Sequence, residues 1–310
     1  MVAAMPHPPP KESKPALRYS IGAAQFEPDA LAPGLYIVAT PIGNLGDITI
    51  RALATLAAAD IILCEDTRTT AKVLHRYAIR TKLAAYHEHN AAKVRPGIIR
   101  QLKEQAAMAL VSDAGMPLVS DPGYRLAVEA AAEGIAVTCC PGPSSVLTAL
   151  VLSGLPTDRF GFFGFVPQKQ GERRAVFLEL KNLRSTLVFF ESPHRIVATL
   201  HDIAAALPGR AVTVARELTK LHEEILRGPA SEVAGMLAQR ISVKGEITLL
   251  IGPPDESAAA VSEEELSAAI AETVASMPAS KAASELARRF NMGKKEIYAR
   301  ILAAKGNADG

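Results

Sequence analysis

The chain has 310 residues, more than one compact core normally holds, which indicates two or three domains. Hydrophobic residues make up 49% and charged residues 21%, as in typical globular proteins, and the net charge of only +2 indicates no class of partner. No stretch approaches about 18 uninterrupted apolar residues, so no membrane span is predicted, and the N-terminus lacks the apolar core of a signal peptide. The cysteines Cys64, Cys139 and Cys140 are odd in number and end apolar runs, which favours reduced thiols and a cytoplasmic protein.

The first two segments differ sharply in pattern. Residues 1–33 contain seven prolines and no apolar periodicity, so a disordered leader is predicted. In residues 34–155, apolar runs typical of buried strands alternate with helical patterns, which predicts an α/β domain with a mainly parallel sheet. The predicted strands are Leu35–Ala39, Ile61–Cys64, Leu83–Tyr86, Met108–Val111 and Ile135–Cys139, and the helices between them include Ile48–Ala59, Val94–Gln105 and Tyr124–Glu133.

A second α/β domain is predicted over residues 156–253. Its last strand-like segments follow one another too closely for crossover helices, so part of this sheet is predicted to be antiparallel. The predicted strands are Phe160–Val166, Thr186–Phe190, Ala211–Ala215, Glu224–Leu226 and Glu246–Ile251, with helices at Glu172–Leu180 and His194–Leu207. Residues 254–261 are acidic and rich in Ala and Ser, which is typical of a linker.

Residues 262–310 are predicted to form a small helical domain. A capping-box pattern at Ser262 and Glu265 begins one helix, and a break at 291–293 separates a second helix from one over Lys294–Leu302, an arrangement like a helix-turn-helix. Residues 276–305 hold seven bases and two acids, a net charge of +5. A basic segment on a nearly neutral chain suggests nucleic acid, although a solvated helix face would have the same composition.

Polar loops follow each of the five strands predicted in the first domain. In a parallel sheet ligands bind at the carboxyl ends of the strands, so these loops predict a ligand site. No G-x-G-x-x-G or G-x-x-x-x-G-K-[ST] motif is present, which argues against a conventional dinucleotide or P-loop phosphate site. The fourth loop, Ser112–Gly123, combines two aspartates with glycines and prolines that favour close backbone approach to a ligand. In the fifth, Ser144 or Ser145 can cap the next helix while backbone amides face a ligand.

The second and third loops leave alternatives open. Asp66 could hold a ribose, or it could pair with Arg68 at the start of a helix. His87 and His89 could ligate a metal, but no cysteine or further histidine stands at a suitable spacing, so a polar substrate loop is favoured and no metal site is predicted.

Charged clusters also follow strands of the second domain, at Glu191–Arg195, Arg216–Lys220 and His222–Glu224. They could be surface ion pairs of little energetic value. The interpretation we favour is a basic wall that accepts phosphate and faces the loops of the first domain.

Taken in order, these loops resemble one family, ribosomal RNA small subunit methyltransferase I, within the tetrapyrrole-methylase superfamily. The resemblance covers about Leu35 to Ile251 and, more loosely, the helical tail. The segments that carry it are TPIGNLGD, CEDTR, HEHN, SDAGMPLVSDPG, PGPSS, FFGF, FFESPHR, ARELTK and KGEITLLIG. Their order, with SDAG-x-P-L-x-SDPG followed by ESPHR, is what makes the resemblance specific.

The resemblance implies a class III methyltransferase with two α/β domains, usually a homodimer, that holds S-adenosyl-L-methionine in the interdomain cleft. The implied reaction is 2'-O-methylation of a cytidine ribose in the decoding centre of 16S ribosomal RNA, so the implied partner is the small ribosomal subunit. The residues implied to contact the cofactor are Pro41, Gly43, Asp113, Gly115, Met116, Ser144 and Ser145.

A ribose hydroxyl is a very weak acid, so methylating it requires a base or a cation that stabilises the developing alkoxide. The candidate bases are Glu65, Asp66, His87, Glu191 and Glu217, and the candidate cations are Arg68, Arg195 and Lys220. From these we select Asp66, Arg68, His87 and Lys220 as the catalytic set.

Two other functions fit parts of the sequence. A tetrapyrrole or diphthine methylase of the same fold would use the same cofactor, but the ESPHR cluster and the basic tail favour RNA. A ligand-sensing, DNA-binding regulator would use the C-terminal helices, but five polar loops on one rim outweigh one helix-turn-helix pattern.

Overall fold

The computed structural model describes residues 17–254, 263–290 and 292–306. They form two compact units: one contains both α/β domains up to Pro253, and the other contains the C-terminal helices. The predicted linker therefore lies, apart from Pro254, outside the described residues.

Regular secondary structure begins closer to the N-terminus than predicted. Strands β1 (Tyr19–Ile21) and β2 (Ala24–Phe26) form an antiparallel hairpin. Tyr19 is buried and stacks on Phe26, and the Ser20 N–H donates to the carbonyl oxygen of Tyr77. The prediction of a disordered leader is therefore wrong for this hairpin, whose short strands, YSI and AQF, mix polar and apolar residues and form no apolar run. Residues 1–16 lie outside the described part of the chain.

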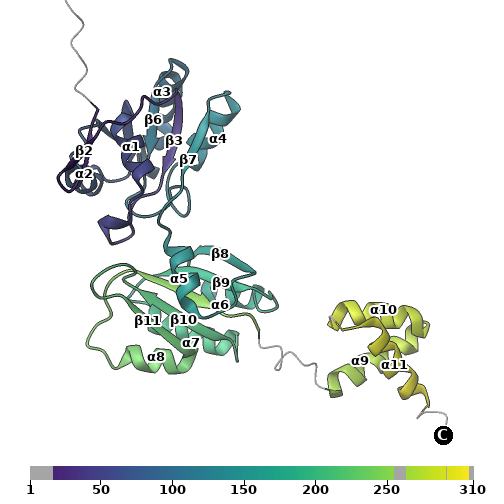
Figure 1. Cartoon of the computed structure of the whole chain (residues 1–310). Helices are drawn as coiled ribbons and strands as arrows, with labels where there is room; N and C mark the ends of the chain where they lie inside the picture. The colour runs from purple at the N-terminus through teal and green to yellow at the C-terminus, as the bar shows by residue number, and fades with distance from the viewer. Residues whose placement is uncertain (1–16, 255–262, 291, 307–310) are drawn as a thin grey trace, which may run out of the picture. The chain divides into compact units, whose positions relative to one another are not determined.

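The first α/β domain has a five-stranded, fully parallel sheet in the order β5-β4-β6-β3-β7. The strands β6, β3 and β7 of this sheet are labelled in Figure 1. Side chains that alternate along its strands form two cores: Val38 and Ile62 pack with α1 and α2 on one face, and Leu35 and Leu63 pack with α3 and α4 on the other. The strands are β3 (Gly34–Val38), β4 (Ile61–Cys64), β5 (Leu83–Ala85), β6 (Ala107–Leu110) and β7 (Val137–Cys140). The helices are η1 (Leu45–Asp47), α1 (Ile50–Ala58), α2 (Thr67–Arg76), α3 (Glu88–Lys103) and α4 (Tyr124–Ala132).

The predicted strands of this domain are confirmed to within two residues, but α3 begins six residues before its predicted start at Val94. The amide of His87 donates to Asn90 Oδ1 (2.9 Å), which fixes the chain at the start of the helix. The third loop is therefore shorter than predicted, because Glu88–Asn90 belongs to the first turn of α3.

The second domain contains a mixed sheet, as predicted, and its strands lie in the order β11-β10-β12-β9-β8. Only β8 and β9 pair in parallel. One face is covered by α6, α7 and α8, and the other by α5, which follows Ser144 directly. The elements are α5 (Ser145–Ser153), β8 (Phe160–Phe165), α6 (Gln170–Glu179), β9 (Thr186–Glu191), α7 (Ile196–Ala206), β10 (Ala211–Arg216), β11 (Glu224–Pro229), α8 (Ala230–Ala238) and β12 (Ile247–Ile251).

The C-terminal unit consists of α9 (Glu263–Ser276), α10 (Ala279–Phe290) and α11 (Lys294–Gly306). Leu266, Leu286, Ile297 and Ile301 are almost completely buried in its core. The predicted helical domain is thus confirmed, with a last helix that runs four residues further than Leu302. Ser262, the predicted cap, lies outside the described residues.

Candidate functional site

The first and fourth loops of the parallel sheet are joined by an isolated antiparallel bridge between Thr40 and Gly115. The Thr40 amide donates to the Gly115 carbonyl (2.9 Å), and the Gly115 amide donates to the Thr40 carbonyl (3.0 Å). Gly115 has a φ of +82°, a conformation that side chains with a Cβ rarely adopt, and a Cβ there would lie 3.3 Å from Ile42 Cγ2. The bridge therefore requires glycine and holds residues 113–116 in place.

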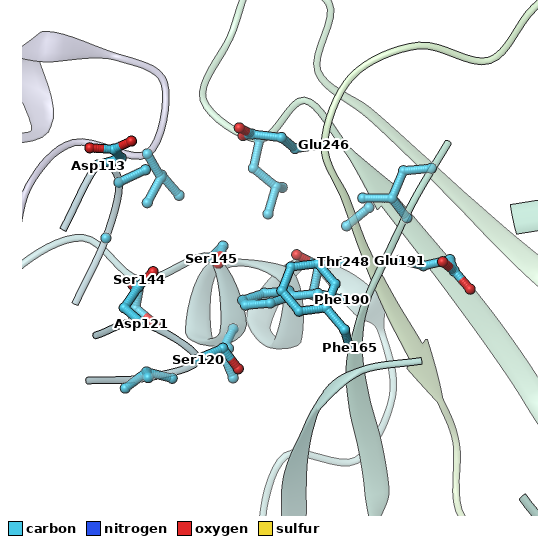
Figure 2. Close-up of a pocket in the computed structure, with 18 of the residues that line it drawn as sticks. Asp113, Ser120, Asp121, Ser144, Ser145, Phe165, Phe190, Glu191, Glu246 and Thr248 are labelled. Atoms are coloured by element: carbon cyan, nitrogen blue, oxygen red, sulfur yellow. The ribbon is translucent and has the colours of Figure 1, made fainter. Parts of the chain in front are cut away.

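A cavity of about 400 Å³ opens beside this bridge and is lined by residues from both α/β domains (Figure 2). The first domain and the start of α5 supply Ile42, Asp113–Met116, Val119–Asp121 and Ser144–Val146. The second domain supplies Phe165, Phe190–Pro193, Ala215, Leu218 and Gly245–Thr248. Five of the seven residues predicted to contact a cofactor thus line one cavity: Asp113, Gly115, Met116, Ser144 and Ser145.

The charged side chains that line the cavity are all acidic: Asp113, Asp121, Glu191 and Glu246. Glu191 is buried, and its carboxylate lies away from those of Asp113, Asp121 and Glu246 (Figure 2). It accepts hydrogen bonds from Arg195 and Thr199. The other three carboxylates remain at the cavity, and no lysine, arginine or histidine is among its described lining residues. Such a wall attracts a cationic ligand and repels a polyphosphate.

Asp121 has the most unusual carboxyl group of this wall. Burial, together with the nearby charges of Glu65 and Asp113, raises the pKa of Asp121 to about 6, despite a hydrogen bond from Ser112. Its loop is also strained, because Leu118 (φ +72°) and Ser120 (φ +62°) adopt the left-handed conformation. Strain and a displaced pKa in one loop are typical of functional sites.

Two aromatic rings form the apolar part of the cavity. Phe165 and Phe190 meet edge to face with ring centroids 5.3 Å apart, and both line the cavity (Figure 2). Phe165 is 63% exposed, an unusual exposure for a ring of this size, so much of the ring is accessible to a planar ligand group. The predicted site did not include these rings, although both lie in segments, FFGF and FFESPHR, that carry the family resemblance. It also lacked Asp121 and Glu246.

The other two predicted cofactor contacts, Pro41 and Gly43, are not among the lining residues, although Ile42 between them is. A Cβ on Gly43 would lie 2.5 Å from Lys220 Cγ and 2.8 Å from the Leu218 carbonyl oxygen. Glycine at this position therefore allows residues 218–220 of the second domain to approach the first loop closely.

Lys220 does not line the cavity itself but contacts a residue that does. Its Nζ contacts Glu217 Oε1 (2.8 Å) and Glu246 Oε2 (2.9 Å), and Glu246 lines the cavity. Burial opposes the charged form of Lys220, but its bonds to the two carboxylates outweigh burial and raise its pKa. Lys220 is therefore a charged group that partly neutralises this wall of the cavity.

Asp66 and Arg68 form an ion pair outside the cavity lining, with Arg68 Nη2 2.7 Å from Asp66 Oδ2. Asp66 also caps α2 by accepting from the Arg68 amide (2.8 Å). Hydrogen bonds from Arg68 lower the pKa of Asp66 to about 2. The second loop still adjoins the cavity, because the Asp66 amide donates to Asp113 Oδ1 (3.1 Å).

His87 is likewise absent from the cavity lining and stands at the N-cap of α3, half-buried. Its ring centroid is 6.0 Å from that of His89. Within the described ranges, no group of three or more His, Cys, Asp or Glu residues is placed to hold a metal ion.

The arginines of the predicted basic wall are held by carboxylates of their own domain. Arg195 pairs with buried Glu191 (2.6 Å), and Arg216 and Arg240 both pair with Glu224 (3.0 and 2.6 Å). Hydrogen bonds from Arg240 and Arg216 lower the pKa of Glu224 to about 2. For these arginines the geometry favours the alternative interpretation, that of structural ion pairs.

No helix among the described residues is long and apolar enough to cross a membrane.

Comparison with solved structures shows the same fold in other proteins. Diphthine synthase superposes with a TM-score of 0.56 at 14% identity, covering 70% of this chain and 89% of that chain. A uroporphyrin-III C-methyltransferase from Thermus thermophilus superposes with a TM-score of 0.51 at 20% identity, covering 71% of this chain and 94% of that chain. At these identities the likeness concerns the fold alone.

Sequence comparison is more specific. Residues 34–234 match the tetrapyrrole (corrin/porphyrin) methylases, and residues 260–305 match the C-terminal helix-turn-helix domain of RsmI. The ribosomal RNA small subunit methyltransferase I of Mesorhizobium japonicum is 47% identical over 94% of this chain and 99% of its own length. The protein of the same name from Halalkalibacterium halodurans is 50% identical over 70% of this chain and 75% of its own length. The chain therefore belongs to the ribosomal RNA small subunit methyltransferase I family, within the tetrapyrrole methylases.

Proposed function

We propose that this protein transfers a methyl group from S-adenosyl-L-methionine to the 2'-oxygen of a cytidine in the decoding centre of 16S ribosomal RNA. The observation that carries the proposal is the cavity, which combines acidic side chains with an exposed aromatic ring and has no basic residue in the part of its lining that the structure describes. S-adenosyl-L-methionine carries a sulfonium and an ammonium group, and both are attracted to carboxylates. The relatives' names supply the class of substrate.

The lining residues fit this cofactor in chemical type. Asp113 and Asp121 would attract its positive charges, and the face of Phe165 would receive its adenine ring. Backbone groups at Gly115 and Met116, and hydroxyl groups at Ser144 and Ser145, would bind its polar atoms. When bound, the cofactor supplies an activated methyl group that a nucleophile can attack.

In the proposed reaction the ribose 2'-oxygen forms a bond to the methyl carbon while the bond from that carbon to sulfur breaks. The hydroxyl proton must pass to a base, and we propose Asp121 for this role. A pKa of about 6 leaves its carboxylate ionised at neutral pH yet basic enough to accept a proton. Holding the reactants in line and excluding water would supply much of the remaining rate.

Lys220 remains our proposed electrostatic group among the four residues selected from the sequence. Its partner Glu246 lines the cavity, so a shift of that ion pair would bring the lysine's positive charge toward a developing alkoxide. The cap and the ion pair that Asp66 and Arg68 form support structural functions for these two residues instead. His87 stands at the N-cap position of α3 outside the cavity lining, which does not support a catalytic role for it.

The family resemblance also supports a homodimer, and the pattern of Cys64, Cys139 and Cys140 supports a cytoplasmic location. Sedimentation equilibrium of the purified protein tests the dimer.

The reaction is tested by incubating purified protein and methyl-labelled S-adenosyl-L-methionine with small ribosomal subunits that lack the modification. We expect label in 2'-O-methylcytidine after digestion of the RNA to nucleosides. Label on a nucleobase, or no label in RNA at all, would contradict the proposal. Asp121→Asn should bind RNA normally and lose most of its turnover.

A further inference from the structure

Helix α2 and the turn after it carry an unbalanced positive charge. Residues 67–82 contain five lysines and arginines and no aspartate or glutamate. We call these five residues the basic stripe; they are Arg68, Lys72, Arg76, Arg80 and Lys82, and all are exposed. The first three are spaced four residues apart and share one face of the helix, while Val73, Leu74 and Tyr77 pack into the core on the other.

Most of this charge has no carboxylate partner. Arg68 pairs with Asp66, but within the described part of the chain Lys72, Arg76, Arg80 and Lys82 form no ion pair. Like charges four residues apart on a helix destabilise it, so this arrangement does not serve folding. A chain with a net charge of only +2 thus concentrates four uncompensated positive charges within eleven residues.

The basic stripe begins at the rim of the cavity. The loop that starts α2 contacts the cavity wall directly, because the Asp66 amide donates to Asp113 Oδ1 (3.1 Å). From there the ten residues of α2 extend for about 15 Å. A phosphate would be repelled by Asp113 and Asp121 inside the cavity but attracted by the stripe outside it.

Building on the proposed function, we infer that the basic stripe binds the phosphates of the RNA strand that flanks the nucleotide entering the cavity. Phosphate contacts of this kind position a nucleic acid without reading its sequence. An anionic membrane is the other polyanion that such a surface could meet. Membrane-binding helices also need large exposed apolar side chains, and none of those exposed in the described residues lies between 67 and 82.

The test neutralises two bases of the stripe, Lys72→Ala with Arg76→Ala, since alanine is the best helix former. The matched control is Lys93→Ala with Arg100→Ala on α3, two exposed bases on the opposite face of the same sheet. Binding of labelled 16S RNA is measured by fluorescence anisotropy between about 50 and 200 mM salt. Methylation of small subunits is measured separately.

We expect the Lys72/Arg76 variant to bind RNA roughly tenfold more weakly, with a salt slope reduced by about one for each phosphate that is no longer neutralised. Its KM for subunits should rise, whereas kcat at saturation and affinity for S-adenosyl-L-methionine should not change. The Lys93/Arg100 variant should behave like the wild type.

Wild-type RNA affinity in the Lys72/Arg76 variant, or an equal loss of affinity in the control, would overturn the inference. So would a selective loss of binding to phosphatidylserine vesicles, which would assign the stripe to a membrane. The binding assay does not depend on methylation, so the two proposals can be tested separately. If the wild-type protein binds RNA through the basic stripe but methylates no subunit, the proposed reaction is refuted and this inference is supported.

Discussion

Replacing Gly115 with valine tests whether the bridge between the first and fourth loops shapes a cofactor site. Gly115 has a φ of +82°, and its Cβ position lies 3.3 Å from Ile42 Cγ2 and 3.8 Å from the Pro143 carbonyl oxygen. A left-handed conformation costs a residue with a Cβ roughly 1–2 kcal/mol, and the valine methyls add a clash with Ile42. A domain with the usual stability of about 5–15 kcal/mol survives such a loss.

The same valine would displace backbone that lines the cavity. If the loop relieves its strain by moving, affinity for S-adenosyl-L-methionine should fall by more than about tenfold, which corresponds to about 1.4 kcal/mol. Isothermal titration calorimetry measures this affinity, and circular dichroism establishes that the variant is folded.

Gly134 provides a matched control. Its φ is +72°, close to that of Gly115, but a Cβ there would meet nothing within 4 Å, and it does not line the cavity. The Gly134→Val variant should therefore be less stable than the wild type but should bind S-adenosyl-L-methionine with unchanged affinity. Unchanged affinity in folded Gly115→Val would remove this loop from the site, and an equal loss in both variants would show that affinity merely follows stability.

Three further predictions address charge. Because the pKa of Asp121 is raised to about 6, its contribution to stability is greatest below about pH 4 and is lost as pH rises through about 6. Asp121→Asn should therefore raise the melting temperature at pH 8 and not at pH 4, and equal shifts at the two pH values would contradict the assigned pKa. Lys220→Ala should lower single-turnover methylation by roughly 10²-fold with little change in cofactor affinity, whereas a normal rate at saturating RNA would exclude Lys220 from catalysis. Residues 262–310 include the exposed bases Arg288, Arg289, Lys294 and Lys295, so deleting this segment should raise the KM for subunits and flatten its salt dependence, while binding of S-adenosyl-L-methionine survives. An unchanged KM and salt slope would show that the segment has only a structural role.

The sequence predicts most of this fold because buried parallel strands have simple boundaries. Ile61–Cys64 is a short apolar run between Asp60 and Glu65, and the strand occupies the same four residues. The hairpin at 19–26 was not predicted, because its strands YSI and AQF mix polar and apolar residues and are held by tertiary interactions such as the hydrogen bond between Ser20 and Tyr77. Pattern is thus informative where local periodicity decides the structure.

The site is predictable from sequence where backbone shape matters. Gly115 stands out as a glycine in a polar loop, and its left-handed φ shows why glycine is needed. The raised pKa of Asp121 depends on its burial and on the charges of Glu65 and Asp113. Glu65 lies on another loop and approaches Asp121 only in the folded sheet. The sequence identifies Lys220 as a candidate cation, but it does not show that Lys220 pairs with Glu246, which lies at a distant position in the chain. Tertiary pairing of this kind leaves no periodic trace in the sequence.

The most direct test of the account is nucleoside mass spectrometry of small-subunit ribosomal RNA from three strains: one with the intact gene, one with the gene deleted, and one with the deletion complemented by this chain. We predict that a 2'-O-methylcytidine in the decoding centre is lost on deletion and restored by complementation. In a fourth strain, complementation with the Gly115→Val variant should restore it poorly. A 2'-O-methylcytidine content that is the same in all three strains would contradict the proposed function.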